Sequence, residues 1–126
     1  MIPKSGCYES ISGKDTILLK IEKFPDVVTG ILKYNFYQKD KNAGTIEGKF
    51  EGDKLFALYT YKSEGNPSVR EVAFLFKNNT VIEGFGELEE KNGILTFKNK
   101  ESILFSKGIR FSIIDCVENE NKFQLK

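Results

Sequence analysis

The stretch GTIEGKFEGDKLFALYTY, residues 44–61, decides the fold of this chain. Apolar and polar residues alternate on both sides of Gly52-Asp53, and this alternation is typical of a strand with one buried face. A two-residue Gly-Asp turn between two such runs predicts a β-hairpin. Its register sets one apolar face against another, with Ile46, Gly48 and Phe50 opposite Tyr59, Ala57 and Leu55. The other face carries Glu47, Lys49, Glu51 and Lys54, so we expect the apolar face to point inward.

Strand-like runs continue along almost the whole chain. Short segments rich in Ile, Val, Phe, Tyr and Thr are separated by turn signals, and helical periodicity appears nowhere. The expected strands are 7–11, 16–23, 28–39, 44–51, 54–62, 69–77, 80–89, 94–98, 103–106 and 109–115. No connection has the dozen or so residues that a crossover between parallel strands needs. The sequence therefore predicts an antiparallel meander of about eight to ten strands.

The length of 126 residues favours one domain. An open meander of this size would leave two unpaired edges and one uncovered face, and the sequence offers no helix to cover them. Closure into an all-β, up-and-down barrel removes both problems. We expect the barrel to span 7–116, with 1–6 as an N-terminal extension and 117–126 as a polar tail outside it.

The two cysteines support closure of the barrel. Cys7 and Cys116 belong to the first and last expected strands, and a closed meander brings these strands together. The cysteines fit no zinc pattern, so a disulfide is favoured over two free thiols. A disulfide would place the protein in an oxidising compartment, meaning the periplasm, the cell surface or the outside.

The composition argues against several classes of function. The net charge is +1, from 19 basic and 18 acidic residues spread along the chain, so no basic patch predicts nucleic acid or an anionic membrane as a partner. The chain has no His, which removes imidazole bases and the commonest metal ligands. Phosphate-binding loops and nucleophile elbows are missing as well. We therefore expect no enzyme activity, no cofactor and no metal.

The inner face supplies the candidate ligand site. A two-residue turn at Asn78-Asn79 would place Ala73 opposite Gly84 and Glu71 opposite Gly86. Together with Gly48 and Ala57, these small residues would leave parts of the inner wall bare, to be filled either by large side chains or by a small amphipathic ligand. The expected ligand contacts are Tyr34, Tyr59, Tyr61 and Glu71, the tyrosines serving as hydroxyl donors for a buried carboxylate.

The assignment of Glu71 depends on the hairpin register. Arg70 is expected outside, opposite Glu87, in an ordinary cross-strand ion pair. A shift of one residue would exchange the roles of Arg70 and Glu71, because neighbouring residues on a strand point to opposite faces.

An outer aromatic patch supports an alternative function. In the same register Phe56, Phe74, Phe76 and Phe85 point outward, with Leu58, which is more apolar surface than a monomer usually exposes together. Either the patch binds another protein, or a loop or the tail covers it, or a bulge has reversed one strand. The longest expected loop, 63–68, would project beside the patch. A protein-interaction or inhibitor module is therefore the rival to a ligand-binding barrel, with an envelope protein as partner.

Four segments carry a resemblance to a known group. CYESISGKDTILLKI, GTIEGKFEGDKLFALYTYKSEG, SVREVAFLF and VIEGFGELEEKNGILTFKN together resemble the small, largely uncharacterised lipocalin-like lipoproteins of Bacteroidota. The likeness covers about Gly6 to Cys116 and brings no assigned catalytic or ligand residue. It implies an exported parent anchored by a lipid to the outer membrane. Lys4 precedes Ser5-Gly6-Cys7 with no hydrophobic run upstream, so we expect the lipidated cysteine to lie upstream of this sequence rather than at Cys7.

Overall fold

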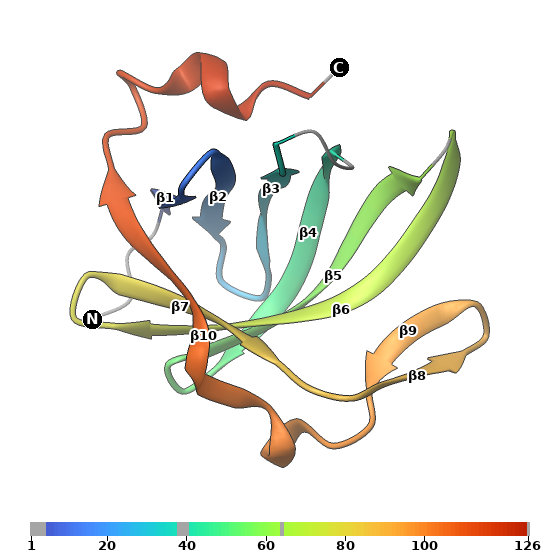
Figure 1. Cartoon of the computed structure of the whole chain (residues 1–126). Coiled ribbons are helices and arrows are strands. Elements are labelled where there is room, and N and C mark those ends of the chain that lie inside the picture. The colour runs from blue at the N-terminus through green and yellow to red at the C-terminus, as the bar shows by residue number, and fades with distance from the viewer. Residues whose placement is uncertain (1–4, 38–40, 64, 126) are drawn as a thin grey trace.

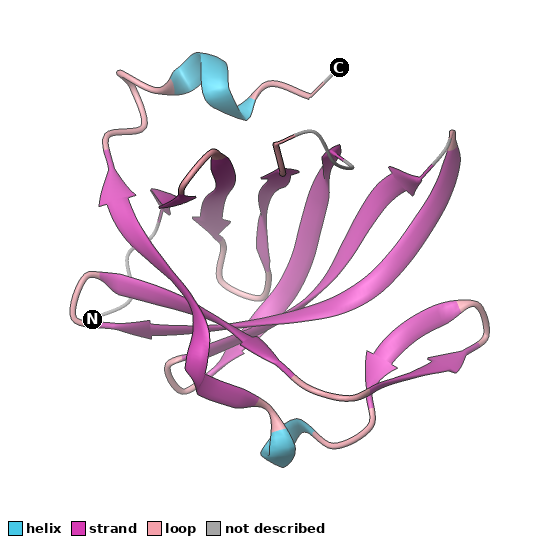
Figure 2. Ribbon diagram, viewed as in Figure 1, coloured by secondary structure: helices cyan, strands magenta, loops and turns pink. Residues whose placement is uncertain are grey.

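A computed structural model describes residues 5–37, 41–63 and 65–125, and most of them lie in strands (Figure 2). The strands are β1 Ser5–Ser12, β2 Asp15–Lys23, β3 Val28–Asn35, β4 Lys41–Glu51, β5 Lys54–Ser63, β6 Asn66–Lys77, β7 Thr80–Phe85, β8 Leu88–Lys91, β9 Ile94–Phe97 and β10 Leu104–Ile114. Two short 3-10 turns flank β10, η1 Lys100–Ser102 before it and η2 Glu120–Phe123 after it. Within the described ranges no helix is long and apolar enough to span a membrane.

Eight strands close into an antiparallel barrel (Figure 1). β1 to β7 pair in chain order, β10 pairs with both β7 and β1, and the ring is complete. The predicted all-β up-and-down barrel is confirmed. Closure leaves these eight strands without a free edge, which is the physical reason a helix-poor meander folds this way.

The β8–β9 hairpin departs from the predicted meander. It lies between β7 and β10 in the sequence but projects to one side of the barrel beside β6 (Figure 1), where β9 pairs in parallel with β6 at Val69 and Arg70. The prediction that every strand lies against its predecessor is therefore wrong here. β8 and β9 have only four residues each, too few to span a wall built from longer strands. No helical crossover is needed for the parallel pair, because β7 and β8 themselves form the connection.

The hairpin registers are as predicted, but the face of two strands is not. Phe50 pairs with Leu55 and Ala73 with Gly84, which confirms both turns. However, β5 and β6 stay paired up to Ser63 and Asn66, so the predicted 63–68 loop is mostly strand. This pairing sets Leu55 opposite Phe74 and thereby turns Phe74 and Phe76 into the barrel.

The inward side chains form one core with two aromatic ends. Toward the β4–β5 and β6–β7 turns lies a lower aromatic group, in edge contacts at 5.1 to 6.0 Å between ring centroids: Tyr8, Phe50, Phe74, Phe76 and Phe111. Toward the β5–β6 turn lie Tyr34, Phe36, Tyr59 and Tyr61. Aliphatic side chains such as Leu19, Ile21 and Leu32, all fully buried, belong to the same core.

The glycines allow close approach rather than leaving holes. A Cβ on Gly48 would lie 2.0 Å from the carbonyl oxygen of Phe56, so β4 and β5 could not pack as they do with any larger residue. On β7, a Cβ on Gly84 would lie 2.7 Å from Ile103, which packs on the outer wall. The predicted inward orientation of Ala73, Gly84 and Gly86 is therefore wrong. These small residues seat the segment after β9 against the outside of the barrel.

The predicted disulfide is confirmed and lies beside the seam of the barrel. Cys7 and Cys116 are bonded with their Cα atoms 5.3 Å apart, and Cys7 pairs with Ile114 of β10. The bond therefore joins the first strand to the residues that follow the last one.

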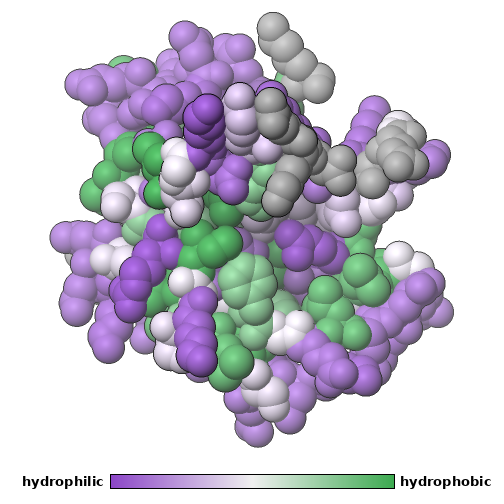
Figure 3. Space-filling view, viewed as in Figure 1, coloured by the Kyte–Doolittle hydropathy of each residue, from purple (hydrophilic) through white to green (hydrophobic). Residues whose placement is uncertain are grey.

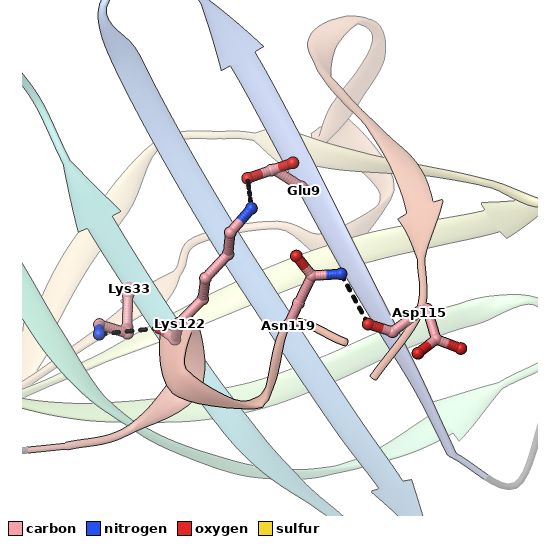
Figure 4. A network of polar contacts seen from close by, with 5 residues as sticks. All are labelled: Glu9, Lys33, Asp115, Asn119 and Lys122. Carbon is pink, nitrogen blue, oxygen red and sulfur yellow. Dashed lines mark hydrogen bonds and ion pairs between the residues drawn. The ribbon is translucent and has the colours of Figure 1, made fainter. Parts of the chain in front are cut away.

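The C-terminal segment folds back over the outer face of β2 and β3. Phe123 of η2 is 3% exposed and packs with Cys7 and Leu18. Lys122 Nζ lies 3.1 Å from the Glu9 carboxylate, and Lys33 Nζ donates to the carbonyl oxygen of Lys122 at 2.9 Å (Figure 4). The segment is therefore held by one buried aromatic ring with polar contacts around it.

Removal of the disulfide is expected to lower the free energy of unfolding by roughly 4 to 5 kcal/mol, since it closes a loop across 109 residues. Urea denaturation of the oxidised protein, the dithiothreitol-reduced protein and the Cys7→Ala/Cys116→Ala variant measures this. The last two should agree with each other. Equal midpoints for the oxidised and reduced proteins would contradict the prediction.

Phe123→Ala is expected to destabilise the protein by about 3 kcal/mol, because it empties the only fully apolar contact of η2 among the described residues. Leu125→Ala is the matched control: Leu125 is 41% exposed, and its truncation should change stability by no more than about 0.5 kcal/mol. Thermal unfolding of wild type and the two variants measures the loss of stability caused by each substitution. Similar losses would show that Phe123 does not hold the segment.

Candidate lumenal binding site

Four side chains from four strands meet inside the barrel and are called here the lumenal polar group: Tyr34 of β3, Tyr59 of β5, Arg70 of β6 and Glu83 of β7. The pairing of β5 with β6 places Arg70 directly opposite Tyr59. The pairing of β6 with β7 places Glu83 opposite the inward Phe74. Strand register alone therefore brings a cation and a carboxylate into an aromatic interior.

Glu83 is bound on one side only. The Tyr34 hydroxyl donates to Glu83 Oε2 at 2.7 Å, and the side chain of Glu83 is fully buried with 1% of the residue exposed. Among the described residues, the other oxygen, Oε1, has no hydrogen-bond partner, and neither has the buried hydroxyl of Tyr59. Buried polar atoms without a partner are uncommon in folded proteins, so two in one place need an explanation.

Arg70 lies across the tyrosine rings. Its guanidinium carbon is 5.4 Å from the ring centroid of Tyr34 and 5.7 Å from that of Tyr59. With the described residues its side chain forms no ion pair within 4.0 Å, although Glu83 is close enough to interact with it electrostatically. The cation is thus held by π faces while its N–H donors remain open to another acceptor.

Burial changes the acidity of the whole group. It raises the pKa of Glu83 from the ordinary 4.5 to about 7, against the opposing effects of the Tyr34 hydrogen bond and the Arg70 charge. Burial likewise raises the pKa values of the Tyr34 and Tyr59 hydroxyls. Both tyrosines are therefore neutral donors at physiological pH, and Glu83 gains or loses a proton near neutrality.

Two half-buried aromatic rings lie on the β5–β6 side of this group. Tyr61 stacks on Tyr59 with 4.7 Å between ring centroids, and Phe36 lies 5.9 Å from Tyr34. A small pocket in the wall, about 30 Å³ in volume and lined by Arg70, Glu83 and Phe97 among others, opens where β6 and β7 stop pairing. That volume is about what one water molecule occupies in liquid water.

The structure places three of the four predicted ligand residues inside. Tyr34 and Tyr59 belong to the lumenal polar group, and Tyr61 lies next to it. The inward orientation of Glu71 is wrong: Glu71 pairs with the outward Leu58, and its Oε1 accepts a hydrogen bond from Phe97 N at 3.0 Å. This hydrogen bond therefore links the end of β9 to the outer face of β6.

Arg70 and Glu83 are the residues that the sequence reasoning missed. Arg70 was expected outside against Glu87, but Glu87 instead lies 3.6 Å from Lys98. The predicted inward position of Gly84 implied that its neighbour Glu83 would face solvent. One signal could have found them: in β6 the apolar volume of Val72, Phe74 and Phe76 exceeds that of the alternate residues, and the larger set belongs inside.

The predicted outer aromatic patch is largely absent. Phe74 and Phe76 lie in the core, with 0% and 8% exposure, so their outward orientation is wrong. Phe56 is outside but lies under η1, where Lys100 Nζ is 4.5 Å from its ring centroid. Phe85 remains 45% exposed beside its partner Leu104, which is 61% exposed. On the face shown in Figure 3, hydrophobic residues lie in several groups among hydrophilic ones.

A hollow of about 620 Å³ lies on the outside of the barrel. Side chains of β2 to β6 and β9 line it, among them the charged Lys20, Glu22 and Glu47 and the apolar Leu58, Val69 and Ile94. Its polar side chains are exposed or half-buried and face solvent. The unpaired buried atoms are elsewhere, in the lumenal polar group, which makes that group the stronger candidate site.

Comparison with known proteins leaves the site without a precedent: no family model, no curated protein and no solved structure matches this chain. Among the described residues, no cluster of three or more Cys, Asp or Glu side chains could hold a metal ion.

The raised pKa of Glu83 predicts a pH-dependent stability. The folded protein holds this proton more tightly than the unfolded chain, so the stabilisation is complete below pH 4.5 and is lost as the pH rises through about 7. A shift of this size corresponds to about 3 kcal/mol. Glu83→Gln keeps an acceptor for Tyr34 but cannot ionise, so its advantage over wild type should grow between about pH 5 and about pH 8. Urea denaturation at both pH values measures it, and parallel pH profiles would refute the buried acid.

Proposed function

We propose that this protein is an exported, non-enzymatic barrel that binds a small amphipathic molecule in its lumen. The observation that carries the proposal is the pair of buried polar atoms, Tyr59 Oη and Glu83 Oε1, that have no partner among the described residues and lie beside the Arg70 guanidinium. Small-molecule sites combine an apolar wall with a few convergent polar groups, and the lumenal polar group has this composition.

The energetic cost of the unsatisfied buried groups supports a ligand. Each unsatisfied buried polar group costs about 1 to 3 kcal/mol, and here two such groups and a cation lie together rather than scattered through the core. A core without function would be more stable with Phe at position 59 and an apolar residue at 83. A ligand that offers both an acceptor and a donor would recover this cost on binding.

The lower aromatic group limits where a ligand fits. Phe74, Phe76 and Phe111 fill the barrel toward the β4–β5 turn, and their neighbours Leu55 and Val81 are fully buried. The half-buried rings of Tyr61 and Phe36 lie on the other side of the lumenal polar group. We therefore place the ligand between the lumenal polar group and the β5–β6 end, with its apolar part against these two rings.

An exported location belongs to the same proposal. Disulfides persist in oxidising compartments, and the Cys7–Cys116 bond is compatible with the periplasm or the cell surface. The resemblance to lipocalin-like lipoproteins of Bacteroidota agrees with it and adds a lipid anchor upstream. Binding rather than catalysis is favoured by the chemistry of the group, because guanidinium and phenol groups hold a ligand and the Glu83 carboxyl is already bonded to Tyr34.

The rival function has lost most of its support. A protein-interaction or inhibitor module required a projecting 63–68 loop and an exposed patch of four phenylalanines. β5 and β6 pair through most of that loop, and two of the four rings lie in the core.

Two single-tryptophan reporters test lumenal binding, since the chain has no Trp of its own. Tyr61→Trp places the indole in the lumen, and Thr60→Trp places it one residue away on the outer wall. Bromine quenches an indole on contact, so ω-bromoundecanol or ω-bromoundecanoic acid, kept below the micellar concentration, should quench the first reporter saturably and leave the second unchanged. Fluorescence titration measures both, and equal quenching of the two reporters, or none, would remove the proposed function.

A further inference from the structure

We propose that the lumenal ligand is an amphipathic acid, whose carboxylate binds Arg70 and whose binding loads a proton onto Glu83. This inference rests on the proposed lumenal binding and names the class of ligand. It is carried by the arrangement of Arg70, Tyr59 and Glu83, which offers donors to an anion and an acceptor for one proton.

A cationic ligand is disfavoured because Arg70 already lies against the ring faces of Tyr34 and Tyr59. Electron-rich ring faces are the usual seat of a bound cation, and Tyr34 and Tyr59 present two of them to the lumen. The guanidinium of Arg70 already lies against both rings, at 5.4 and 5.7 Å. A second cation at this place would meet like charge, so the site selects against amines.

The open donors point to an anion. A guanidinium carries five N–H donors and no acceptor, and its planar fork matches a carboxylate through two parallel hydrogen bonds. The described residues give the Arg70 side chain ring contacts but no acceptor within hydrogen-bond distance. The Tyr59 hydroxyl, from the residue directly opposite Arg70, adds another unused donor. These donors converge from neighbouring strands, as recognition of one carboxylate requires.

A trapped water cannot replace the acid. The wall pocket of about 30 Å³ beside Arg70 and Glu83 has room for about one water molecule, which could bond to Glu83 Oε1. A neutral water would leave Arg70 with no anion in contact. A carboxylate satisfies the charge as well as the hydrogen bonds.

Glu83 supplies the coupled proton. The titratable or charged groups that interact with it are Tyr34 from β3, Tyr59 from β5 and Arg70 from β6, while its partner on β10 is the apolar Ile109. Arg70 is thus the one described cation that favours ionised Glu83. A ligand carboxylate bound to Arg70 neutralises the positive charge that favours ionised Glu83, and it adds a negative charge nearby. We therefore expect Glu83 to take up a proton from solvent as the anion binds. No covalent bond is made or broken.

Matched acid and alcohol probes test the charge requirement. In the Tyr61→Trp protein, ω-bromoundecanoate should quench at concentrations at least about 10-fold lower than ω-bromoundecanol, because hydrogen bonds to charged groups are the stronger ones. Arg70→Met should weaken the acid by about 10- to 100-fold and leave the alcohol unchanged. Arg110→Met, at the only other arginine of the chain and exposed on β10, is the matched control and should change neither. Arg70→Lys, which keeps the charge, should retain part of the preference and serves if the Met variant does not fold.

Calorimetry tests the proton. Titrating the wild-type protein with undecanoate near neutral pH, in two buffers of different ionisation enthalpy, should give a net uptake of protons that approaches one per ligand as the pH is raised above about 7. Glu83→Gln should bind undecanoate at least as tightly and take up none. Uptake that persists in Glu83→Gln, or that is absent from wild type, would overturn the coupling.

The outcomes separate this inference from the proposed function. Equal quenching of the lumenal reporter by acid and alcohol, or no effect of Arg70→Met on the acid, overturns the acid preference while lumenal binding stands. Quenching of that reporter by neither probe overturns both.

Discussion

The pairing of β5 with β6 is the constraint on which the interior depends. It sets Leu55 opposite Phe74 and Tyr59 opposite Arg70, and a shift of one residue would send every side chain of β6 to the other face. β7 follows, since its register to β6 is fixed by the turn at Asn78-Asn79. One pairing therefore decides both that the core is aromatic and that a cation and a buried carboxyl lie within it.

The barrel can tolerate the unfavourable free energy of the lumenal polar group because the rest of the core is well packed. The lower aromatic group and the buried aliphatic residues form a continuous apolar region, and the strands close without a free edge. Against that background the lumenal polar group stands out: Glu83 has one partner, Tyr59 has none, and Arg70 relies on ring faces. A complementary ligand that forms hydrogen bonds with these groups would remove the cost of leaving them unsatisfied, and this gain would favour binding.

Outside the barrel, two segments cover the wall. The segment after β9 packs Ile103 on Gly84, while Glu71 bonds to the backbone of Phe97. The C-terminal segment places Phe123 over Cys7 and Leu18, next to the disulfide. Of the apolar residues that the strand pattern assigned to solvent, Phe74 and Phe76 lie in the core and Phe56 lies under η1, whereas Leu58 and Phe85 remain 41% and 45% exposed.

The sequence by itself determined the strands, the hairpin turns, the closed barrel and the cysteine pair, because alternation and turn residues are local signals and closure follows from the lack of a helix. It also placed Tyr34 and Tyr59 inside. Only the tertiary structure decided which face of β6 and β7 is the inner one, and with it the exchange of Glu71 for Arg70 and the burial of Glu83. The physical reason is that both faces of these strands are apolar, one packing in the core and the other under the β8–β9 region, so the alternation that sets the face elsewhere is silent there and a long-range pairing has to set it.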